Sequence, residues 1–516
     1  MKKRQITNII NFIRGVEPRT EMDLIKPVKE QILLMKKYNF KGTFLIQYDA
    51  LCNSEFTNIL SELDPAMFEI GVWFEVVQPL VEKAGLKWTG RYPWDWYAHC
   101  GFSVGYTKRE RESFVDILFE DFKKCFGYYP KSFGSWAFDA HTLNYANEKY
   151  GLDAACNCKD QWGTDGYTLW GGYYNQAYYP SKFNAFCPAS TSENQIDTPV
   201  FRMLGSDPIH QYDSGVDIYQ KESAGVHGVF TLEPVYTTEA GGGMPSWVDW
   251  YFKENFNEKC INFSYTQAGQ ENSFGWESMK DGLEYQFEKL SSMVEDGTIE
   301  IETLGESGRW YKKSFSNTPP TSITALSDWT DKDRRSIWYN CKNYRLNLYA
   351  EKGHFWIRDI YMFRETYQER YMEEICTSNE FIYDNLPFVD GNRFSGNGRR
   401  AGMYLTENEA CGMEYKDIVY EETDDKLKVI FTGTPYGDVK FTLSENGCKI
   451  RTESDKLKLV RLYNEESKEL PQMEKKSDDE LELCHNNYRY SVKLKKGKLI
   501  DKDTMVFEDG KLKMLF

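Results

Sequence analysis

Short apolar runs alternate with longer amphipathic segments through the first 310 residues of the chain. Runs such as residues 42–46 (GTFLI) and 68–75 (FEIGVWFE) are nearly continuous in apolar residues, which is typical of strands buried on both faces. Residues 21–38 and 277–294 instead repeat apolar positions at helical spacing. Strands that alternate with helices predict a parallel sheet, and this number of them predicts a (β/α) barrel of about seven strands.

The last strands of the barrel are expected within residues 228–306. Residues 228–233 (GVFTLE) are interpreted as its seventh strand and residues 299–306 (IEIETLGE) as the last strand of the set. Residues 261–276 (INFSYTQAGQENSFGW) mix polar, aromatic and glycine residues, an order typical of a loop.

The pattern changes at residues 317–322 (NTPPTS), where two prolines indicate a linker. Beyond it, helical spacing nearly disappears, and runs such as residues 344–349 and 426–432 alternate with a period of two. The fold class is therefore α/β, with an N-terminal (β/α)7-type barrel in residues 1–316 and a C-terminal all-β sandwich in residues 317–516.

Most of the predicted barrel strands end on an acidic residue. These residues are Glu17, Glu75, Asp139, Asp160, Asp207, Glu233 and Glu306. Because the carboxyl ends of parallel strands converge on one mouth of a barrel, we expect at least two of these carboxylates to share a pocket. The alternative for each acid taken alone is a helix N-cap or an ion pair with an arginine.

Charge and composition exclude several function classes. The net charge of −16 disfavours nucleic acid and anionic membranes as partners, and no apolar window is long enough to span a bilayer. The 12 cysteines are scattered without a CxxC pair, and the start of the chain is interpreted as a strand rather than a signal peptide, so we expect a cytoplasmic protein with reduced thiols. Six histidines are few for a metal site, so no metal or other cofactor is expected.

Carboxylates beside aromatic side chains suit a sugar substrate, because sugar C–H faces stack on rings while acids hold hydroxyls or act at the anomeric carbon. The catalytic candidates are Asp139, Glu233, Glu17 and Glu75. Glu75 follows Trp73 on the same side of a strand, and a carboxyl that is desolvated against an indole acquires the raised pKa of a general acid.

Two of these candidates have a structural alternative of similar weight. Asp139 stands between Trp136 and His141, but it also precedes a predicted helix and would serve as its N-cap. Glu17 has Arg14 and Arg19 as neighbours in sequence, and an ion pair would keep it charged either as a nucleophile or, slightly favoured, as a structural partner.

Long loops rich in Trp, Tyr and Gly supply the candidate substrate contacts, for which core packing is the alternative. The candidates are Arg14, Trp73, Trp94, Trp136, His141, Asp160, Trp162, Asp165, Asp207, Gln270, Asn272 and Trp276.

With the strands placed in this order, residues 5–310 resemble the polysaccharide deacetylase superfamily of (β/α) barrels, which also includes glycoside hydrolases of the mannosidase and amylase type. Residues 69–75 (EIGVWFE) occupy the place of the metal motif in those deacetylases, and residues 129–155 (YPKSFGSWAFDAHTL…YGLDAA) the place of their Arg-Pro-Pro-Tyr-Gly motif. The family's metal triad is an Asp after the first strand and two His after the third. This chain has Glu17 after the first strand, and Trp73 and Val77 where the histidines would stand.

A barrel of this type followed by a large β domain is similar to retaining glycosidases of family fifty-seven and of the mannosidase kind. In family fifty-seven the nucleophile is a Glu on the fourth strand and the acid an Asp on the seventh. The resemblance places Asp139 and Glu233 at these positions, with the residue types exchanged.

The sequence therefore predicts a metal-independent glycoside hydrolase that cleaves oligosaccharides or other glycosides with two carboxylates at the barrel mouth. One alternative is a divergent metal-dependent carbohydrate deacetylase, in which Asp139, His141 and neighbouring acids hold the metal. The other is a sugar-binding barrel without catalysis.

Overall fold

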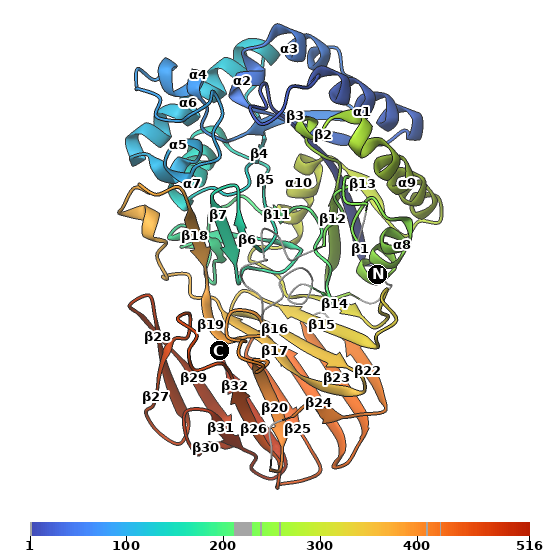
Figure 1. Ribbon diagram of the computed structural model, residues 1–516, viewed down its shortest axis with the longest axis vertical. Coiled ribbons are helices and arrows are strands. Elements are labelled where there is room, and N and C mark those ends of the chain that lie inside the picture. The colour runs from blue at the N-terminus through green and yellow to red at the C-terminus, as the bar shows by residue number, and fades with distance from the viewer. Residues whose placement is uncertain (1–2, 211–229, 238–239, 257–259, 409–410, 424) are drawn as a thin grey trace.

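The computed structural model describes residues 3–210, 230–237, 240–256, 260–408, 411–423 and 425–516. A barrel surrounded by helices forms one half of the molecule, and two antiparallel sheets form the other half (Figure 1). The predicted fold class, a (β/α)7-type barrel followed by a β-sandwich, is confirmed. None of the helices within these ranges is both long and apolar enough to cross a membrane.

Seven parallel strands form the barrel, in the order β12-β1-β2-β3-β4-β5-β11. They are β1 (Arg4–Ile13), β2 (Gly42–Ile46), β3 (Phe68–Trp73), β4 (Ser132–Gly134), β5 (Ala154–Asn157), β11 (Val200–Arg202) and β12 (Phe263–Ala268). A short strand, β8 (Ala177–Tyr178), runs antiparallel to β11. The barrel is nearly closed, because the Leu204 amide, just after β11, donates to Gln267 Oε1 on β12 at 2.9 Å.

The seventh strand is not the one that the sequence predicted. It is β12, inside residues 261–276, whose polar side chains had indicated a loop. These side chains are buried and paired, since Thr266 bonds Tyr251 and Gln267 bonds backbone atoms across the barrel seam. In residues 230–233 only an isolated bridge forms, between Ser206 and Thr231, and residues 228–229 lie outside the described residues.

The predicted last strand is shorter than expected and does not reach the mouth. β13 (Glu300–Glu302) pairs with the first half of β1. Thr303 then caps helix α10 (Leu304–Ser314), and the Glu306 side chain accepts from the Thr303 amide in a capping box. Glu306 is therefore a helix-capping residue at the far end of the barrel, paired with Lys41 at 2.5 Å.

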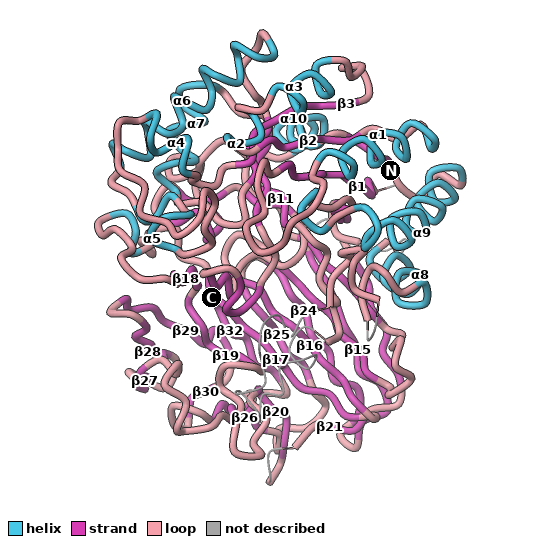
Figure 2. Tube along the Cα trace, turned by 45° about the horizontal axis from the view of Figure 1, so that its top comes forward, coloured by secondary structure: helices cyan, strands magenta, loops and turns pink. Residues whose placement is uncertain are grey.

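Helices cover the outside of the barrel (Figure 2). They are α1 (Ile25–Tyr38), α2 (Tyr48–Leu51), α3 (Ser54–Ser61), α4 (Gln78–Lys83), α6 (Lys108–Phe126), α7 (Ala140–Tyr150), α8 (Pro245–Asn255) and α9 (Trp276–Glu295), together with α10, while the short α5 (Ala98–Gly101) lies in the loop after β3. Helix α6 shows how local sequence sets these bounds. Thr107 and Glu110 form a capping box at its start, and Gly127, with φ of 83°, ends it in the left-handed region.

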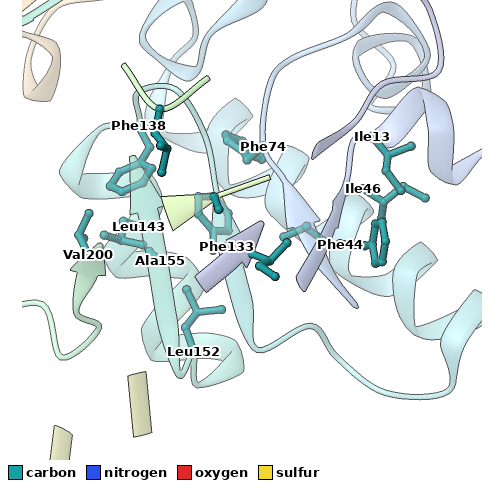
Figure 3. Packing of buried hydrophobic residues seen from close by; sticks show 14 of the residues in the cluster. Ile13, Phe44, Ile46, Phe74, Phe133, Phe138, Leu143, Leu152, Ala155 and Val200 are labelled. Atoms are coloured by element: carbon teal, nitrogen blue, oxygen red, sulfur yellow. The ribbon is translucent and has the colours of Figure 1, made fainter. Parts of the chain in front are cut away.

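The barrel strands are buried on both faces, as their continuous apolar runs predicted. Phe44 and Ile46 of β2 point outward into a cluster that includes Phe133 of β4 and Leu143 of α7 (Figure 3). Leu45, between them, points inward to a second cluster that includes Trp73. The inner cluster lies beneath the barrel mouth and supports it.

The C-terminal half contains two sheets that enclose one apolar core. The first follows the path β14 (Thr321–Ala325), β15 (Arg334–Asn340), β16 (Tyr344–Glu351), β17 (His354–Met362), β20 (Gly402–Thr406), β26 (Lys458–Leu462), β31 (Thr504–Val506) and β30 (Lys498–Leu499), with β19 (Leu386–Asp390) and β21 (Met413–Glu414) also paired to β17. The second follows β22 (Asp417–Glu422), β23 (Lys426–Thr434), β24 (Gly437–Ser444), β25 (Gly447–Arg451), β32 (Lys511–Leu515), β29 (Tyr488–Lys496), β28 (Glu480–His485) and β27 (Gln472–Lys475). Phe355 of the first sheet stacks on Phe431 of the second, with ring centroids 3.7 Å apart.

The two halves are joined by strands and by buried charge. β18 (Phe381–Asp384), from the C-terminal half, extends a small sheet formed by β6 (Gln161–Thr164) and β7 (Tyr167–Trp170) of the barrel half, where β9 (Pro180–Ser181) and β10 (Asn184–Pro188) form a hairpin. Asp160 accepts from Arg202 at 2.9 Å and from Arg345 of β16 at 2.5 Å. The predicted boundary between residues 316 and 317 falls between α10 and β14, and it stays a prediction.

Removing the Asp160 charge should strongly destabilise the protein, because it leaves Arg202 and Arg345 buried without their shared carboxylate. We expect Asp160→Asn to lower the free energy of unfolding by about 3–5 kcal/mol, as measured by urea denaturation. The matched control is Asp153→Asn, which breaks an ion pair with Arg309 whose arginine side chain is 56% exposed and should cost less than about 1 kcal/mol. Equal small losses in both variants would contradict a structural role for the Asp160 charge.

Candidate active site at the barrel mouth

A cavity of about 390 Å³ opens at the carboxyl ends of the barrel strands. Its walls come from the segments that follow β1, β4, β5, β11 and β12, which is where a barrel of this type places its chemistry. The residues that line it are Glu17, Arg19, Thr20, Trp136, Gln161, Gly163, Asp165, Tyr167, Leu204, Glu233, Tyr236, Glu271, Ser273 and Phe274.

Arg14, the residue after β1, is buried behind this cavity and contacts three carboxylates. Its guanidinium lies 3.3 Å from Glu75, 3.4 Å from Glu271 and 3.9 Å from Glu17. Its other face covers the Trp94 ring, with the guanidinium carbon 3.8 Å from the ring centroid. Burial opposes the charge, but the surrounding carboxylates outweigh burial and raise the pKa of Arg14. Arg14 is therefore a permanent cation that holds acids from three different strand ends together.

Glu75 is the most thoroughly enclosed of these acids. Oε2 accepts from Trp73 Nε1 at 2.9 Å and from Gln47 Nε2 at 3.0 Å, while Oε1 is buried with no hydrogen-bond partner among the described residues. Burial raises the pKa of Glu75 to about 7, although Arg14 and the Trp73 hydrogen bond lower it. Desolvation is the cause that the sequence analysis gave for a raised pKa, but the Trp73 N–H, through its hydrogen bond, acts in the opposite direction. Glu75 does not line the cavity.

Glu233 and Glu271 both line the cavity and are connected through one side chain. Gln270 Nε2 donates to Glu233 Oε1 at 3.4 Å, and the Glu271 amide donates to Gln270 Oε1 at 2.9 Å. Thr231 Oγ1 also donates to Glu233 at 2.8 Å, and Ser273 Oγ to Glu271 at 2.5 Å. Burial raises the pKa of both acids, against the lowering effects of Thr231 on Glu233 and of Arg14 on Glu271.

Sequence reasoning selected both neighbours of Glu271 but not Glu271 itself. An acid shortly after a barrel strand was the pattern used for the other candidates. Glu271 follows β12 in this way, but it was missed because β12 was interpreted as part of a loop. Gln270 is the bridge described above. Asn272 is a clamp for the backbone, since its Oδ1 accepts from the Arg14 amide and its Nδ2 donates to the Arg14 carbonyl, both at 2.9 Å.

Glu17 and Asp165 also line the cavity and share one arginine. Arg19 Nε donates to Glu17 at 2.8 Å, and Arg19 Nη1 donates to Asp165 at 3.2 Å. Burial would raise the pKa of Glu17, but the hydrogen bonds and charges of Arg19 and Arg14 lower it. Glu17 is thus an ionised partner of two arginines at the cavity wall.

Asp139 is not among the cavity residues and has the capping contacts that the sequence analysis gave as its alternative. Its Oδ1 accepts from the Thr142 amide at 2.9 Å at the start of α7, and Arg111 Nη1 lies 3.0 Å away. His141 points elsewhere, with Nε2 2.9 Å from Glu112. Trp136 does line the cavity, and its buried Nε1 has no partner among the described residues.

The remaining sequence candidates divide between the rim and the supporting structure. Asp160 belongs to the buried network with Arg345, and Asp207 accepts from Trp247 Nε1 at 3.1 Å and Trp329 Nε1 at 3.0 Å. Trp276, the first residue of α9, packs against the core. Trp162 is 37% exposed and lies between two residues that line the cavity.

The superfamily resemblance implies a metal, and the described residues do not fit one. Within the described ranges no three His, Cys, Asp or Glu side chains are placed to hold an ion. The described histidines are His99, His141, His210, His354 and His485, and none of these lines the cavity. His227 lies outside the described residues.

The structure matches known barrel structures, whereas comparisons of the sequence find no match. No protein-family model matches the sequence, and no curated protein matches it. A protein from Parabacteroides distasonis, provisionally described as a glycoside hydrolase/deacetylase, matches with a TM-score of 0.53 and 16% identity, over 70% of this chain and 85% of that chain. At this identity the match shows the fold, a barrel like that of the Parabacteroides distasonis protein.

Two lower-scoring matches accompany it. A protein from Mycobacterium smegmatis, provisionally described as a polysaccharide deacetylase, has a TM-score of 0.36 and 12% identity, over 61% of this chain and 92% of that chain. A GH57 branching enzyme from Thermococcus kodakaraensis has a TM-score of 0.32 and 10% identity, over 61% and 72%.

Glu369, from the C-terminal half, lies beside Asp139 and allows a test of how the two halves are held together. Its two oxygens accept from the Ala140 and Ala185 amides, both at 2.9 Å, and burial together with the Asp139 charge raises its pKa to about 8. Between about pH 5 and pH 8 the folded state therefore holds a proton that the unfolded chain has lost, so stability falls as pH rises. The measurement is the free energy of unfolding in urea at several pH values. We expect it to fall less steeply between pH 5 and pH 8 in Glu369→Gln than in the unmodified chain.

Glu365 provides the matched control for this measurement. It also accepts from two backbone amides, those of Ser190 and Thr191 at 2.9 Å, but its pKa is lowered: hydrogen bonds, from Asn194 first, outweigh burial. Glu365→Gln should therefore leave the slope between pH 5 and pH 8 unchanged. It should lower stability at neutral pH, and its difference from the unmodified chain should shrink as the pH falls into the acid range. If Glu369→Gln kept the full slope of the unmodified chain, Glu369 would be ionised in the folded protein.

Proposed function

We propose that this chain is a metal-independent glycoside hydrolase whose catalytic carboxyls are Glu233 and Glu271. The observation that carries the proposal is the placement of these two buried acids in one cavity, connected by Gln270. Glycoside hydrolysis needs two carboxyl groups, one to protonate the leaving oxygen and one to act as nucleophile or base. The surrounding Trp136, Tyr167 and Tyr236 offer apolar ring surface to a sugar.

The electrostatic surroundings assign different roles to the two acids. Glu233 accepts hydrogen bonds from a hydroxyl and an amide, both neutral, and burial raises its pKa although Thr231 and the Lys159 charge lower it. A raised pKa suits a general acid, so Glu233 is assigned to protonate the leaving group. Glu271 lies 3.4 Å from the Arg14 guanidinium, which favours its ionised form. Glu271 is therefore assigned as the carboxylate that faces the anomeric carbon.

Glu75, Glu17 and Arg14 act as positioning residues in this proposal. Glu75 and Glu17 neutralise Arg14 and Arg19, and Arg14 in turn orients Glu271. Asp139 takes no part in the mechanism, because Arg111 and the first turn of α7 occupy its carboxylate.

The test is hydrolysis of a panel of nitrophenyl glycosides and acetylated sugars, with and without a chelator. We expect chelator-resistant glycoside cleavage, with kcat/KM lowered by about 10²–10⁴-fold in Glu233→Gln and Glu271→Gln. Glu112→Gln, which alters a carboxylate paired with His141 on the outer helices, is the control and should keep full activity.

The pH profile separates the two roles. Activity should fall at high pH as Glu233 loses its proton and at low pH as Glu271 gains one. Aryl glycosides with good leaving groups need little help from a general acid, so Glu233→Gln should retain some turnover on them. Its activity should no longer fall at high pH but should still fall at low pH. Acetate release abolished by the chelator would indicate a deacetylase instead, and binding without turnover of any compound would indicate a sugar-binding protein.

A further inference from the structure

Some of the exposed aromatic side chains lie in or beside the cavity at the barrel mouth. Among the described residues, five aromatic side chains are well exposed: Tyr92 (41%), Tyr128 (46%), Trp162 (37%), Tyr236 (37%) and Phe274 (37%). Tyr236 and Phe274 line the cavity. Trp162 alternates in β6 with the lining residues Gln161 and Gly163, and it contacts Trp170 and Arg393 instead. Tyr92 stacks on Trp96, which lies 5.2 Å from the guanidinium of the cavity residue Arg19. Tyr128, just after α6, is not a cavity residue either.

These aromatic side chains stand on opposite sides of the mouth. Tyr92 and Trp96 follow β3, whereas Phe274 follows β12 and Tyr236 lies in the segment between β11 and β12. In the strand order β12-β1-β2-β3-β4-β5-β11, β3 is three strands from β12 and three from β11, and the barrel nearly closes between β11 and β12. The cavity with Glu233 and Glu271 therefore has an aromatic surface on each side.

The Tyr92 side is held rigid before any ligand binds. The Tyr92 and Trp96 rings are 5.9 Å apart at an interplanar angle of 17°. Arg91 stacks on Tyr97 at 3.5 Å and is held by Asp95 at 2.7 Å. A preformed ring surface costs little conformational entropy on binding, which suits stacking against the flat face of a sugar.

The charges of the cavity indicate whether a polymer that lies on these rings is charged. Glu17, Asp165, Glu233 and Glu271 line it, and Arg19, the one cation among the lining residues that the structure describes, is already paired with Glu17 and Asp165. A polyanion would face this excess of carboxylates, so an uncharged chain fits better.

We propose that the cavity is the centre of a groove that binds an uncharged polysaccharide chain across the barrel mouth, with sugars on the Tyr92–Trp96 rings on one side and on Phe274 and Tyr236 on the other. The proposal rests on the proposed hydrolase function for its second part: because sugars lie on both sides of the two acids, the enzyme cleaves internal bonds rather than releasing terminal sugars.

Binding is tested by gel electrophoresis of the full chain through dissolved polysaccharides, with starch, xylan, glucomannan and mixed-linkage β-glucan as uncharged probes and polygalacturonate as the anionic one. We expect retardation by at least one uncharged polymer and none by polygalacturonate. Tyr92→Ala and Phe274→Ala should each weaken the affinity about 3- to 10-fold, and the double variant by roughly the product, since the two sites are far apart. Tyr128→Ala is the matched control and should bind like the unmodified chain.

Cleavage of the retarding polymer tests the second part. We expect its viscosity to fall while few reducing ends have formed, because internal cuts shorten a chain fastest. Release of one small sugar from the start would overturn internal cleavage. No retardation, or retardation unaffected by Tyr92→Ala and Phe274→Ala, would overturn the groove. Retardation lost in these variants without any turnover would support the groove and count against the hydrolase.

Discussion

Burial of the Arg14 guanidinium is the constraint on which the mouth of this barrel depends. A buried cation needs compensating charge, and here the carboxylates come from the ends of three strands: Glu17 after β1, Glu75 after β3 and Glu271 after β12. The same contacts bring together segments that are more than 250 residues apart in sequence. The requirement to neutralise one arginine thus helps to shape the cavity and, in the proposed mechanism, sets which carboxyl is ionised.

The carboxylates of the barrel fall into two groups according to their partners. Asp139, Asp160 and Asp207 are satisfied by arginines, indoles or backbone amides, and they hold helix ends or join the two halves of the molecule. Glu233 and Glu271 combine burial with exposure to a cavity, and their pKa values are raised. In the proposed mechanism the reacting acids are those whose desolvation is incompletely compensated and that face a cavity, and such perturbed acids often mark functional sites.

Sequence patterning succeeded where burial follows from local composition. The continuous apolar runs at β2 and β3 were placed correctly because both faces of these strands are covered, and the period of two identified the sandwich strands. Patterning failed at β12, where Thr266 and Gln267 are polar but buried and bonded across the barrel. Glu233 was selected for a wrong reason. The sequence placed it at the end of a strand, whereas residues 230–233 form only an isolated bridge.

The sequence by itself determined the alternation of strands and helices, the change to a β-sandwich and the concentration of acids and aromatic side chains near strand ends. These properties depend on residues close together along the chain. Only the tertiary structure decided which acids share a cavity, because a carboxylate after a strand can cap a helix, as Asp139 does, or face the mouth, as Glu271 does. The local pattern offered both roles for Asp139. The choice between them depends on distant partners, since Arg111 pairs with Asp139 and Arg14 with Glu271.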